Sequence, residues 1–211
     1  MSITESTADN RALHDPDVQL MLRVRDDDAA AFESLVHRYQ PRLMTVMKNY
    51  VGGGPQAEDL VQEVFLRVYR ARRRYRPEAR FATWLFTIAN NVAANTLRSL
   101  ARRREVNLAG RVDGSGAVTL EQLVQEASGL MPTRQLAKSE MSEIIHLAMQ
   151  TLNDRQRMAV LLCKFEHMSY ADIAQAMQLS PSAVKSLLCR ARASLRTVLE
   201  PYLADGSRPE L

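Results

Sequence analysis

The sequence predicts an all-α protein with two small helical domains joined by a flexible linker, the C-terminal one containing a helix-turn-helix. The chain has 211 residues, of which only eight are glycine and eight are proline, and strong helix formers dominate the rest. Apolar residues recur at helical spacing, and no alternating β-pattern of useful length occurs. Residues 169–196 have the pattern of two helices separated by a tight turn, with basic side chains on the second.

Changes in composition and periodicity divide the chain into five segments. The first 28 residues hold seven acidic and three basic residues and lack an apolar stretch, which predicts a tail and excludes a secretory signal or a membrane segment. We therefore expect a cytoplasmic protein without membrane insertion. The predicted segments are an acidic N-terminal tail (1–28), a first domain (29–104), an acidic linker (105–138), a second domain (139–200) and a C-terminal tail (201–211).

The first domain is predicted as four helical stretches. Residues 29–50 are helical but broken by Pro41, and Gly52-Gly53-Gly54-Pro55 ends this part of the chain. The next helix covers about 56–71. After an arginine-rich turn, a long helix begins near Arg80 and continues towards Arg104.

The second domain begins near residue 139 with one helix, followed by a helix that Asn153 caps and that runs to about residue 164. Ser169 and Asp172 form a capping box for the first helix of the helix-turn-helix. Ser180 followed by Pro181 starts the second, because serine is a favoured cap and proline fits the first helical position.

Charge is distributed unevenly along the chain. Residues 67–104 contain 11 arginines and a single carboxylate, Glu78, whereas residues 1–40 contain eight acidic and four basic residues. A basic segment of this density is typical of a surface that faces phosphate. A solvated helix surface without a specific partner is the alternative.

The second helix of the helix-turn-helix has one packing side and one outward side. The packing side carries Val184, Leu187, Leu188, Ala191 and Leu195. On the outward side, residues of the first turns suit base edges and residues farther along suit phosphates. The expected base-reading residues are Ser182, Lys185 and Ser186, and the expected phosphate contacts are Arg190, Arg192 and Arg196.

Enzyme chemistry finds no support in the sequence. The four histidines are scattered, and no paired carboxylates, nucleophile or phosphate-binding loop occurs at useful spacing. Cys163 and Cys189 stand apart from one another, which indicates neither a zinc site nor a disulfide. We expect a protein that is not an enzyme and that has no metal or cofactor.

Three motifs occur in a fixed order along the chain. Residues 57–65 read Ala-Glu-Asp-Leu-Val-Gln-Glu-Val-Phe, residues 81–91 read Phe-Ala-Thr-Trp-Leu-Phe-Thr-Ile-Ala-Asn-Asn, and residues 169–192 contain Ser-Tyr-Ala-Asp-Ile-Ala, Val-Lys-Ser and Arg-Ala-Arg. Together they resemble the sigma-70 family of RNA polymerase sigma factors, specifically its extracytoplasmic function (ECF) group. The resemblance covers roughly residues 29–104 and 139–200.

The resemblance implies a promoter-specificity subunit of core RNA polymerase. In the family, the outer face of the helix over 56–71 binds the clamp helices of the largest polymerase subunit, and the second domain meets the flap of the second-largest. The corresponding residues here are Asp59, Gln62, Glu63 and Leu66. Without the resemblance, a solvated face with one surface leucine is the simpler interpretation.

The helix that follows Arg80 is expected to melt and hold the -10 promoter element. Its packing side carries Phe81, Trp84, Leu85, Ile88 and Val92, and its opposite side carries Thr83, Phe86, Thr87 and Asn90. Melting requires basic groups for the backbone and polar groups for an unpaired base. The candidates are Arg80, Asn90, Asn91, Arg98, Arg102 and Arg103. The second domain would then read the -35 element as duplex, and the resemblance also implies an anti-sigma partner.

Two positions depart from the family pattern. Leu187 lies where family members often have arginine, so the -35 sequence is expected to differ, and Asn95 lies where they often have aspartate and is expected to be a hydrogen-bonded packing amide. Cys189 is interpreted as a small apolar residue rather than a redox-sensitive contact. The competing functions are a conventional helix-turn-helix regulator and a nucleic-acid enzyme with a helical accessory domain.

Overall fold

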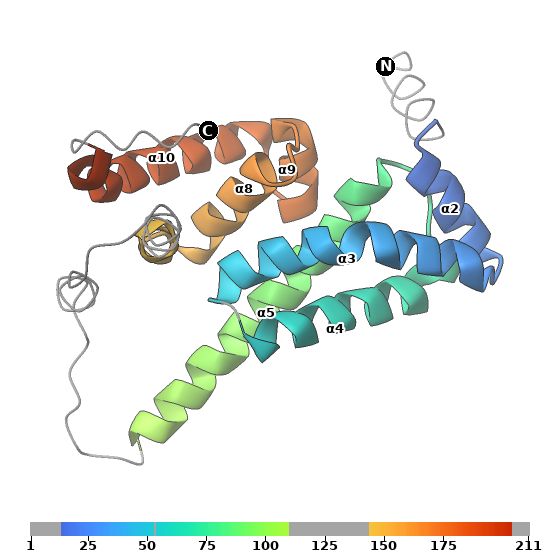
Figure 1. The fold of residues 1–211 in the computed structure, drawn as a ribbon, viewed down its shortest axis with the longest axis horizontal. Coiled ribbons are helices and arrows are strands. Elements are labelled where there is room, and N and C mark those ends of the chain that lie inside the picture. Colours follow the sequence, from blue (N-terminus) through green and yellow to red (C-terminus); the bar gives the residue numbers. More distant parts are fainter. Residues whose placement is uncertain (1–13, 53, 110–143, 204–211) are drawn as a thin grey trace, which may run out of the picture.

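The computed structural model describes residues 14–52, 54–109 and 144–203, and within these ranges every regular element is a helix. Figure 1 shows the two groups of helices, a first domain in blue to green and a second in orange to red. The prediction of a linker over residues 105–138 is wrong for residues 105–109, which continue the long helix that starts at Phe81, and the rest of it lies outside the described residues. None of the described helices has both the length and the hydrophobicity to cross a bilayer.

The first domain is built on two long antiparallel helices, α3 and α4, which lie side by side, with α5 packed against both (Figure 1). Its largest fully buried side chains include Tyr39, Leu43, Phe81 and Leu85. The helices of this domain are α2 (Pro16–Arg25), α3 (Ala29–Val51), α4 (Pro55–Ala71), the short 3₁₀ helix η1 (Arg72–Arg74) and α5 (Phe81–Ala109).

The prediction of a tail over residues 1–28 is wrong for residues 16–25, which form α2 and pack on α3. Val18, Met21 and Val24 are fully buried, and each such burial contributes about 1.5–3 kcal/mol. The Asp15 side chain caps the helix by accepting from the backbone N–H of Asp17 at 3.0 Å. The sequence signal was present, because a capping residue followed by Pro16 is the same signal that predicts the start of the second helix of the helix-turn-helix.

The predicted break at Pro41 is also wrong, because α3 continues through it to Val51. Proline in a helix interior costs about 3 kcal/mol through the lost hydrogen bond and its ring. Tyr39 on one side and Leu43 and Met47 on the other are all buried. Packing of this continuous apolar face against α2 and α4 outweighs the local cost.

The second domain contains the four helices predicted for it. These are a helix over residues 144–150, α8 (Asp154–Lys164), α9 (Tyr170–Met177) and α10 (Pro181–Leu203). The predicted caps are confirmed: Asn153 forms a capping box with Gln156, and Ser169 and Ser180 accept from the backbone N–H groups of Asp172 and Ala183. The second half of the box predicted for Ser169 differs, because the Asp172 carboxylate accepts from the Ser169 hydroxyl at 2.6 Å. Helix α10 passes Pro201 and includes Leu203, so the prediction of a tail is wrong for residues 201–203, and residues 204–211 lie outside the described residues.

The two domains pack directly against each other. Helix α9 lies against α5, α8 lies against α3, and the buried apolar residues of both domains form one continuous cluster. The predicted architecture of two helical domains therefore holds, but the structure adds a closed arrangement that no sequence pattern indicated.

Candidate nucleic-acid and polymerase interfaces

Helix α10 has the two-sided character that the sequence predicts. Val184, Leu188 and Ala191 are buried against α8 and α9. Leu187 is also buried, at 9% exposure, so this departure from the family pattern lies outside the outward face. All six residues predicted to contact DNA are exposed on that face, namely Ser182, Lys185, Ser186, Arg190, Arg192 and Arg196.

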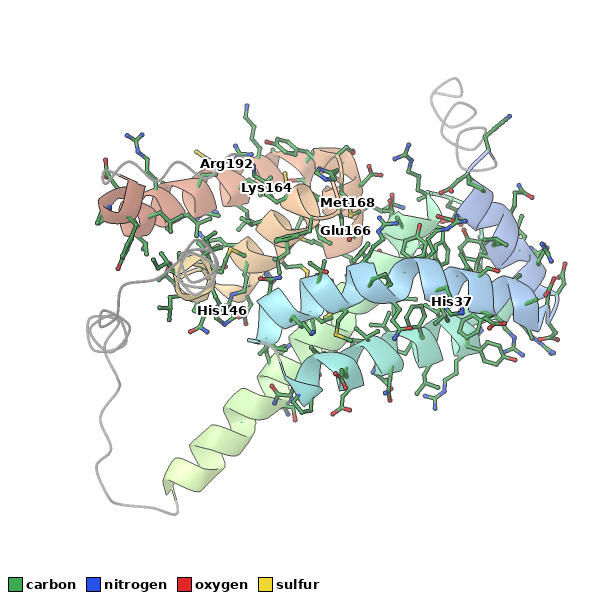
Figure 2. The ribbon with its side chains drawn as sticks, viewed as in Figure 1. His37, His146, Lys164, Glu166, Met168 and Arg192 are labelled. Carbon is green, nitrogen blue, oxygen red and sulfur yellow. The ribbon has the colours of Figure 1, made fainter. Side chains whose placement is uncertain are left out.

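The arginines of this face differ in how firmly they are held. The Arg192 guanidinium donates to the Tyr170 hydroxyl at 3.1 Å, which ties α10 to the start of α9, and this hydrogen bond raises the pKa of Arg192. Arg190 donates to the backbone carbonyl of Ser186 at 3.4 Å. Figure 2 shows Arg192 on α10, well away from the first domain. Cys189 is exposed on the same helix, and its interpretation as a small apolar residue rather than a redox-sensitive contact stays a prediction.

The outer face of α4 is open to solvent. Asp59 and Gln62 are exposed, and Leu66 is 50% exposed. Glu63 accepts from Arg67 at 2.6 Å, one helical turn away. This exposed leucine among polar residues is the arrangement that the sequence predicts for a partner surface.

Sequence reasoning did not single out Tyr69, which lies one turn beyond Leu66 and is 42% exposed. Its ring packs against Phe32 with centroids 5.1 Å apart, and the Arg72 guanidinium lies over it at 4.0 Å. The sequence did contain a signal for Tyr69, because it lies three residues after Leu66 and residues at that spacing are neighbours on a helix surface. Together, Leu66 and Tyr69 make an exposed apolar strip on α4.

The side of α5 that was predicted to face outward is largely covered, and this prediction is wrong for Thr83 and Phe86. Their exposed fractions are 1% and 0%. Helix α9 packs on this side, and the Thr83 hydroxyl donates to the Asp172 carboxylate at 3.2 Å. Asn90 is half-buried, whereas Asn91 is exposed.

The single tryptophan belongs to the packing side of α5, as expected. Trp84 is half-buried, and its ring meets the rings of Tyr75 and Phe81 at centroid distances of 4.8 and 5.9 Å. The Asp15 carboxylate accepts from the backbone N–H of Phe81 at 3.2 Å and so also caps α5. This contact fixes where the helix begins.

The basic residues predicted to hold the -10 strand lie at both ends of α5. Arg80, Arg98 and Arg102 are exposed, and Arg103 lies outside the residues whose side chains are described. Asn95 is exposed too, so the expectation that it packs as a buried amide is wrong. The C-terminal part of α5 extends away from the other helices (Figure 1).

Two arginines join the domains. Arg42 of α3 donates through Nε to the Glu166 carboxylate at 3.0 Å, and the Glu166 side chain is only 2% exposed. Figure 2 shows Glu166 where the second domain meets α3. Burial raises the pKa of Glu166, and the Arg42 hydrogen bond and charge oppose that rise. The pair is thus an ion pair across the domain contact, in which the carboxylate is buried and the guanidinium is partly exposed.

Arg157 of α8 makes the second connection. It donates to the Tyr50 carbonyl of α3 at 2.9 Å and to the carbonyls of Met149, Gln150 and Leu152 in its own domain. The carbonyls of Tyr50, Met149 and Gln150 lie in the last turns of their helices, where acceptors lack the usual intrahelical donor, and the guanidinium supplies one. Burial raises the pKa of the neighbouring Tyr50 to about 12.

No metal-binding constellation occurs in the described ranges, where no three His, Cys, Asp or Glu side chains gather at a suitable distance. The surfaces that the described residues present are a polar and basic face on α10, basic residues around α5 and an apolar strip on α4.

Comparison with known proteins gives a consistent answer for both halves. The family model for Sigma-70 region 2 matches residues 35–104, and the model for Sigma-70, region 4 matches residues 142–195. The chain is 33% identical to the RNA polymerase sigma-H factor of Pseudomonas aeruginosa over 193 residues, covering 90% of this chain and 97% of that protein. It is 32% identical to the ECF RNA polymerase sigma-E factor of Escherichia coli K12 over 189 residues, covering 89% and 96%.

Two solved structures share the fold. CnrH in complex with the cytosolic domain of CnrY matches with a TM-score of 0.61 and 21% identity, covering 86% of this chain and 96% of that chain. The sigma factor RpoE in complex with the anti-sigma factor NepR from Bartonella quintana matches with a TM-score of 0.60 and 23% identity, covering 80% and 96%.

Proposed function

This chain belongs to the sigma-70 family of RNA polymerase sigma factors, in its ECF group, and from that premise we propose how its surfaces divide the work of promoter recognition. The protein is a promoter-directing factor of a non-catalytic family. In the proposal, the first domain binds core polymerase and melts the -10 element, and the second reads the -35 element. It acts where the polymerase is, in the cytoplasm.

The outward face of α10 is the observation that carries the proposal. Its polar residues lie on the exposed side of a helix whose other side packs against α8 and α9, which is the form of a recognition helix that enters a major groove. Lys185 and the serines beside it have the donors to read purine acceptors. Arg190, Arg192 and Arg196 meet the phosphates, and the Tyr170 hydrogen bond orients Arg192.

The outer face of α4 is proposed as the polymerase-binding surface, on the clamp helices of the largest subunit. Leu66 and Tyr69 supply apolar contact, and Asp59, Gln62 and Glu63 supply a polar rim, which is the usual anatomy of a protein interface. The second domain is proposed to meet the flap of the second-largest subunit. A conventional helix-turn-helix regulator has no need of the α4 face, so this surface favours the sigma factor.

Melting of the -10 element is assigned to α5. Arg80, Arg98, Arg102 and Arg103 hold the strand, and Asn90 or Asn91 contacts an unpaired base. Because α9 covers Thr83 and Phe86, we expect the domains to separate when each one binds its own site on polymerase.

An anti-sigma protein is the remaining proposed partner. One solved structure of similar fold is a sigma factor in complex with an anti-sigma factor. In the proposal, such a protein binds this chain while its two domains are in contact and keeps them together.

Transcription with purified components tests the proposal. Core polymerase alone should produce no promoter-dependent transcript, and addition of this protein should restore one. Stable binding to duplex DNA without any transcript would favour the conventional regulator instead.

A matched pair of variants tests the α4 face. Leu66→Gln should weaken binding to core polymerase by at least tenfold, because it places an amide in the centre of the contact. Ile145→Gln, which changes an aliphatic residue of similar exposure (43%) in the second domain, should bind within about twofold of wild type. Equal binding by Leu66→Gln and wild type would remove this face from the interface.

A further inference from the structure

The turn between α2 and α3 carries a carboxylate that reaches across to the arginine-rich turn before α5. Asp27 has a left-handed backbone conformation, with φ of 65°. Its Oδ1 accepts two hydrogen bonds from Arg72, at 2.9 and 2.8 Å, and its Oδ2 accepts one from Arg73 at 2.9 Å. These hydrogen bonds hold the pKa of Asp27 below its usual value.

The two arginines are held to different degrees. Arg72 also donates to the Tyr69 carbonyl at 2.9 Å and stacks over the Tyr69 ring, and its side chain is only 17% exposed. Arg73 has a single bond to Asp27 and is 72% exposed. Arg72 is therefore fixed against the protein, and Arg73 is tethered at its surface.

The other arginines of the same turn have a different environment. Arg74, Arg76 and Arg80 are exposed, and the ion pairs found within the described residues include none of them. The arginines of this turn thus divide by pairing: Arg72 and Arg73 pair with Asp27, and the other three have no ion pair among the described residues.

We propose that Asp27 is a positioning residue that withholds Arg72 and Arg73 from nucleic acid, so that Arg74, Arg76 and Arg80 are the arginines of this turn that meet the DNA backbone. The inference rests on the proposed function, because it needs the first domain to face promoter DNA. Each extra phosphate contact strengthens binding to any sequence equally. Withholding two guanidiniums limits that non-specific affinity and improves promoter discrimination.

The test compares Asp27→Asn with Asp26→Asn in the holoenzyme formed with core polymerase. Asparagine tolerates the left-handed conformation, and both variants remove one negative charge from the same turn. Among the described residues, the Asp26 side chain pairs only with its neighbour Arg25 at 3.4 Å, and it is 73% exposed, so its loss releases no distant arginine of the described part of the chain. Binding to promoter DNA and to non-promoter DNA of equal length is measured across a series of KCl concentrations.

Asp27→Asn should steepen the dependence of log K on log[KCl] by about 0.7–0.9 for each released arginine that contacts a phosphate. Its affinity for non-promoter DNA should rise at least threefold above that of Asp26→Asn. Arg72→Gln combined with Arg73→Gln in the Asp27→Asn background should return the slope to the wild-type value. Identical slopes for Asp27→Asn and Asp26→Asn would overturn the inference.

Single variants in the wild-type background give a second test that does not depend on the folding of Asp27→Asn. Arg74→Gln, Arg76→Gln or Arg80→Gln should lower the salt slope, whereas Arg72→Gln should leave it unchanged. A lower slope for Arg72→Gln would place that arginine on DNA and contradict the proposal. Failure of the wild-type protein to support promoter-dependent transcription would instead overturn the proposed function, which separates the two outcomes.

Discussion

Helices α5 and α10 are the two long helices expected to meet promoter DNA, yet the fold exposes them differently. The polar side of α10 faces solvent along its length, whereas the corresponding side of α5 has Thr83 and Phe86 buried beneath α9. The surface proposed to read duplex is therefore accessible in the closed chain, and part of the surface proposed to hold a single strand is not. The two helices differ in exposure because α9 of the second domain packs on α5, and not because their amino-acid compositions differ.

The largest expected effect comes from Phe86 on the covered side of α5. Phe86→Ala should lower the free energy of unfolding by about 3–5 kcal/mol, because it empties a fully buried aromatic site. Phe165→Ala is the matched control, since that ring is 47% exposed and should change stability by only about 0.5 kcal/mol. Urea unfolding measures both. A loss below 1 kcal/mol for Phe86→Ala would show that this side of α5 is open in solution, like that of α10.

Loss of Arg42 should open the domain contact without disturbing either helix face. Arg42→Ala leaves the Glu166 carboxylate buried without its cation, which costs about 3 kcal/mol. Lys48→Ala, an exposed lysine of the same helix, is the control. Resonance energy transfer between labels on α4 and α10 should report increased separation for Arg42→Ala alone. Unchanged separation would mean that apolar packing suffices to hold α9 on α5.

The same contact should respond to pH. Burial raises the pKa of Glu166 above its ordinary value of 4.5, so the closed form binds this proton more tightly than the open form, in which the carboxyl is in water. Acidification through the raised pKa therefore favours closure, and closure weakens as the pH rises above it. The label separation should follow this direction in wild type and lose this pH dependence in Glu166→Gln.

The sequence predicted the local features of both DNA-facing helices, because caps are short-range signals. Ser169, Ser180 and Asn153 each cap the helix expected of them. The division of α10 into a packing side and an outward side is correct because other helices pack on only one side of it. The same division was wrong for α5, because helices pack on two sides of it: α4 of its own domain and α9, which lies far along the chain. Periodicity reveals an apolar side, but it does not reveal that Thr83 is covered by α9.

Long-range contacts explain the other differences. Glu166 lies 124 residues from Arg42, and Asp27 lies 45 residues from Arg72. Neither pair has the spacing of three or four residues at which side chains meet on a helix. The count of charges along the sequence therefore could not distinguish the arginines around η1 from one another. The structure separates them into those that pair with Asp27 and those that have no ion pair among the described residues.

A smaller effect is expected on the exposed side of α10. Lys185→Ala should weaken binding of the holoenzyme to promoter duplex by about 1–3 kcal/mol and relax specificity at one -35 position, if the lysine reads a base. Lys164→Ala removes an equal charge from an exposed position on α8 and should leave specificity unchanged. Equal loss on promoter and non-promoter duplex would reassign Lys185 to a phosphate.

The smallest expected effect concerns the start of α10. The Ser180 hydroxyl accepts from the backbone N–H of Ala183 at 3.2 Å, and its loss in Ser180→Ala should cost about 1 kcal/mol of stability. Ser194→Ala, on an exposed position within the same helix, should be nearly neutral. Because Ser182, Lys185 and Ser186 lie in the first turns, fraying there should weaken -35 binding while leaving single-strand binding by α5 unchanged. A parallel loss of both activities would show that the two helices are coupled through α9 and do not act independently.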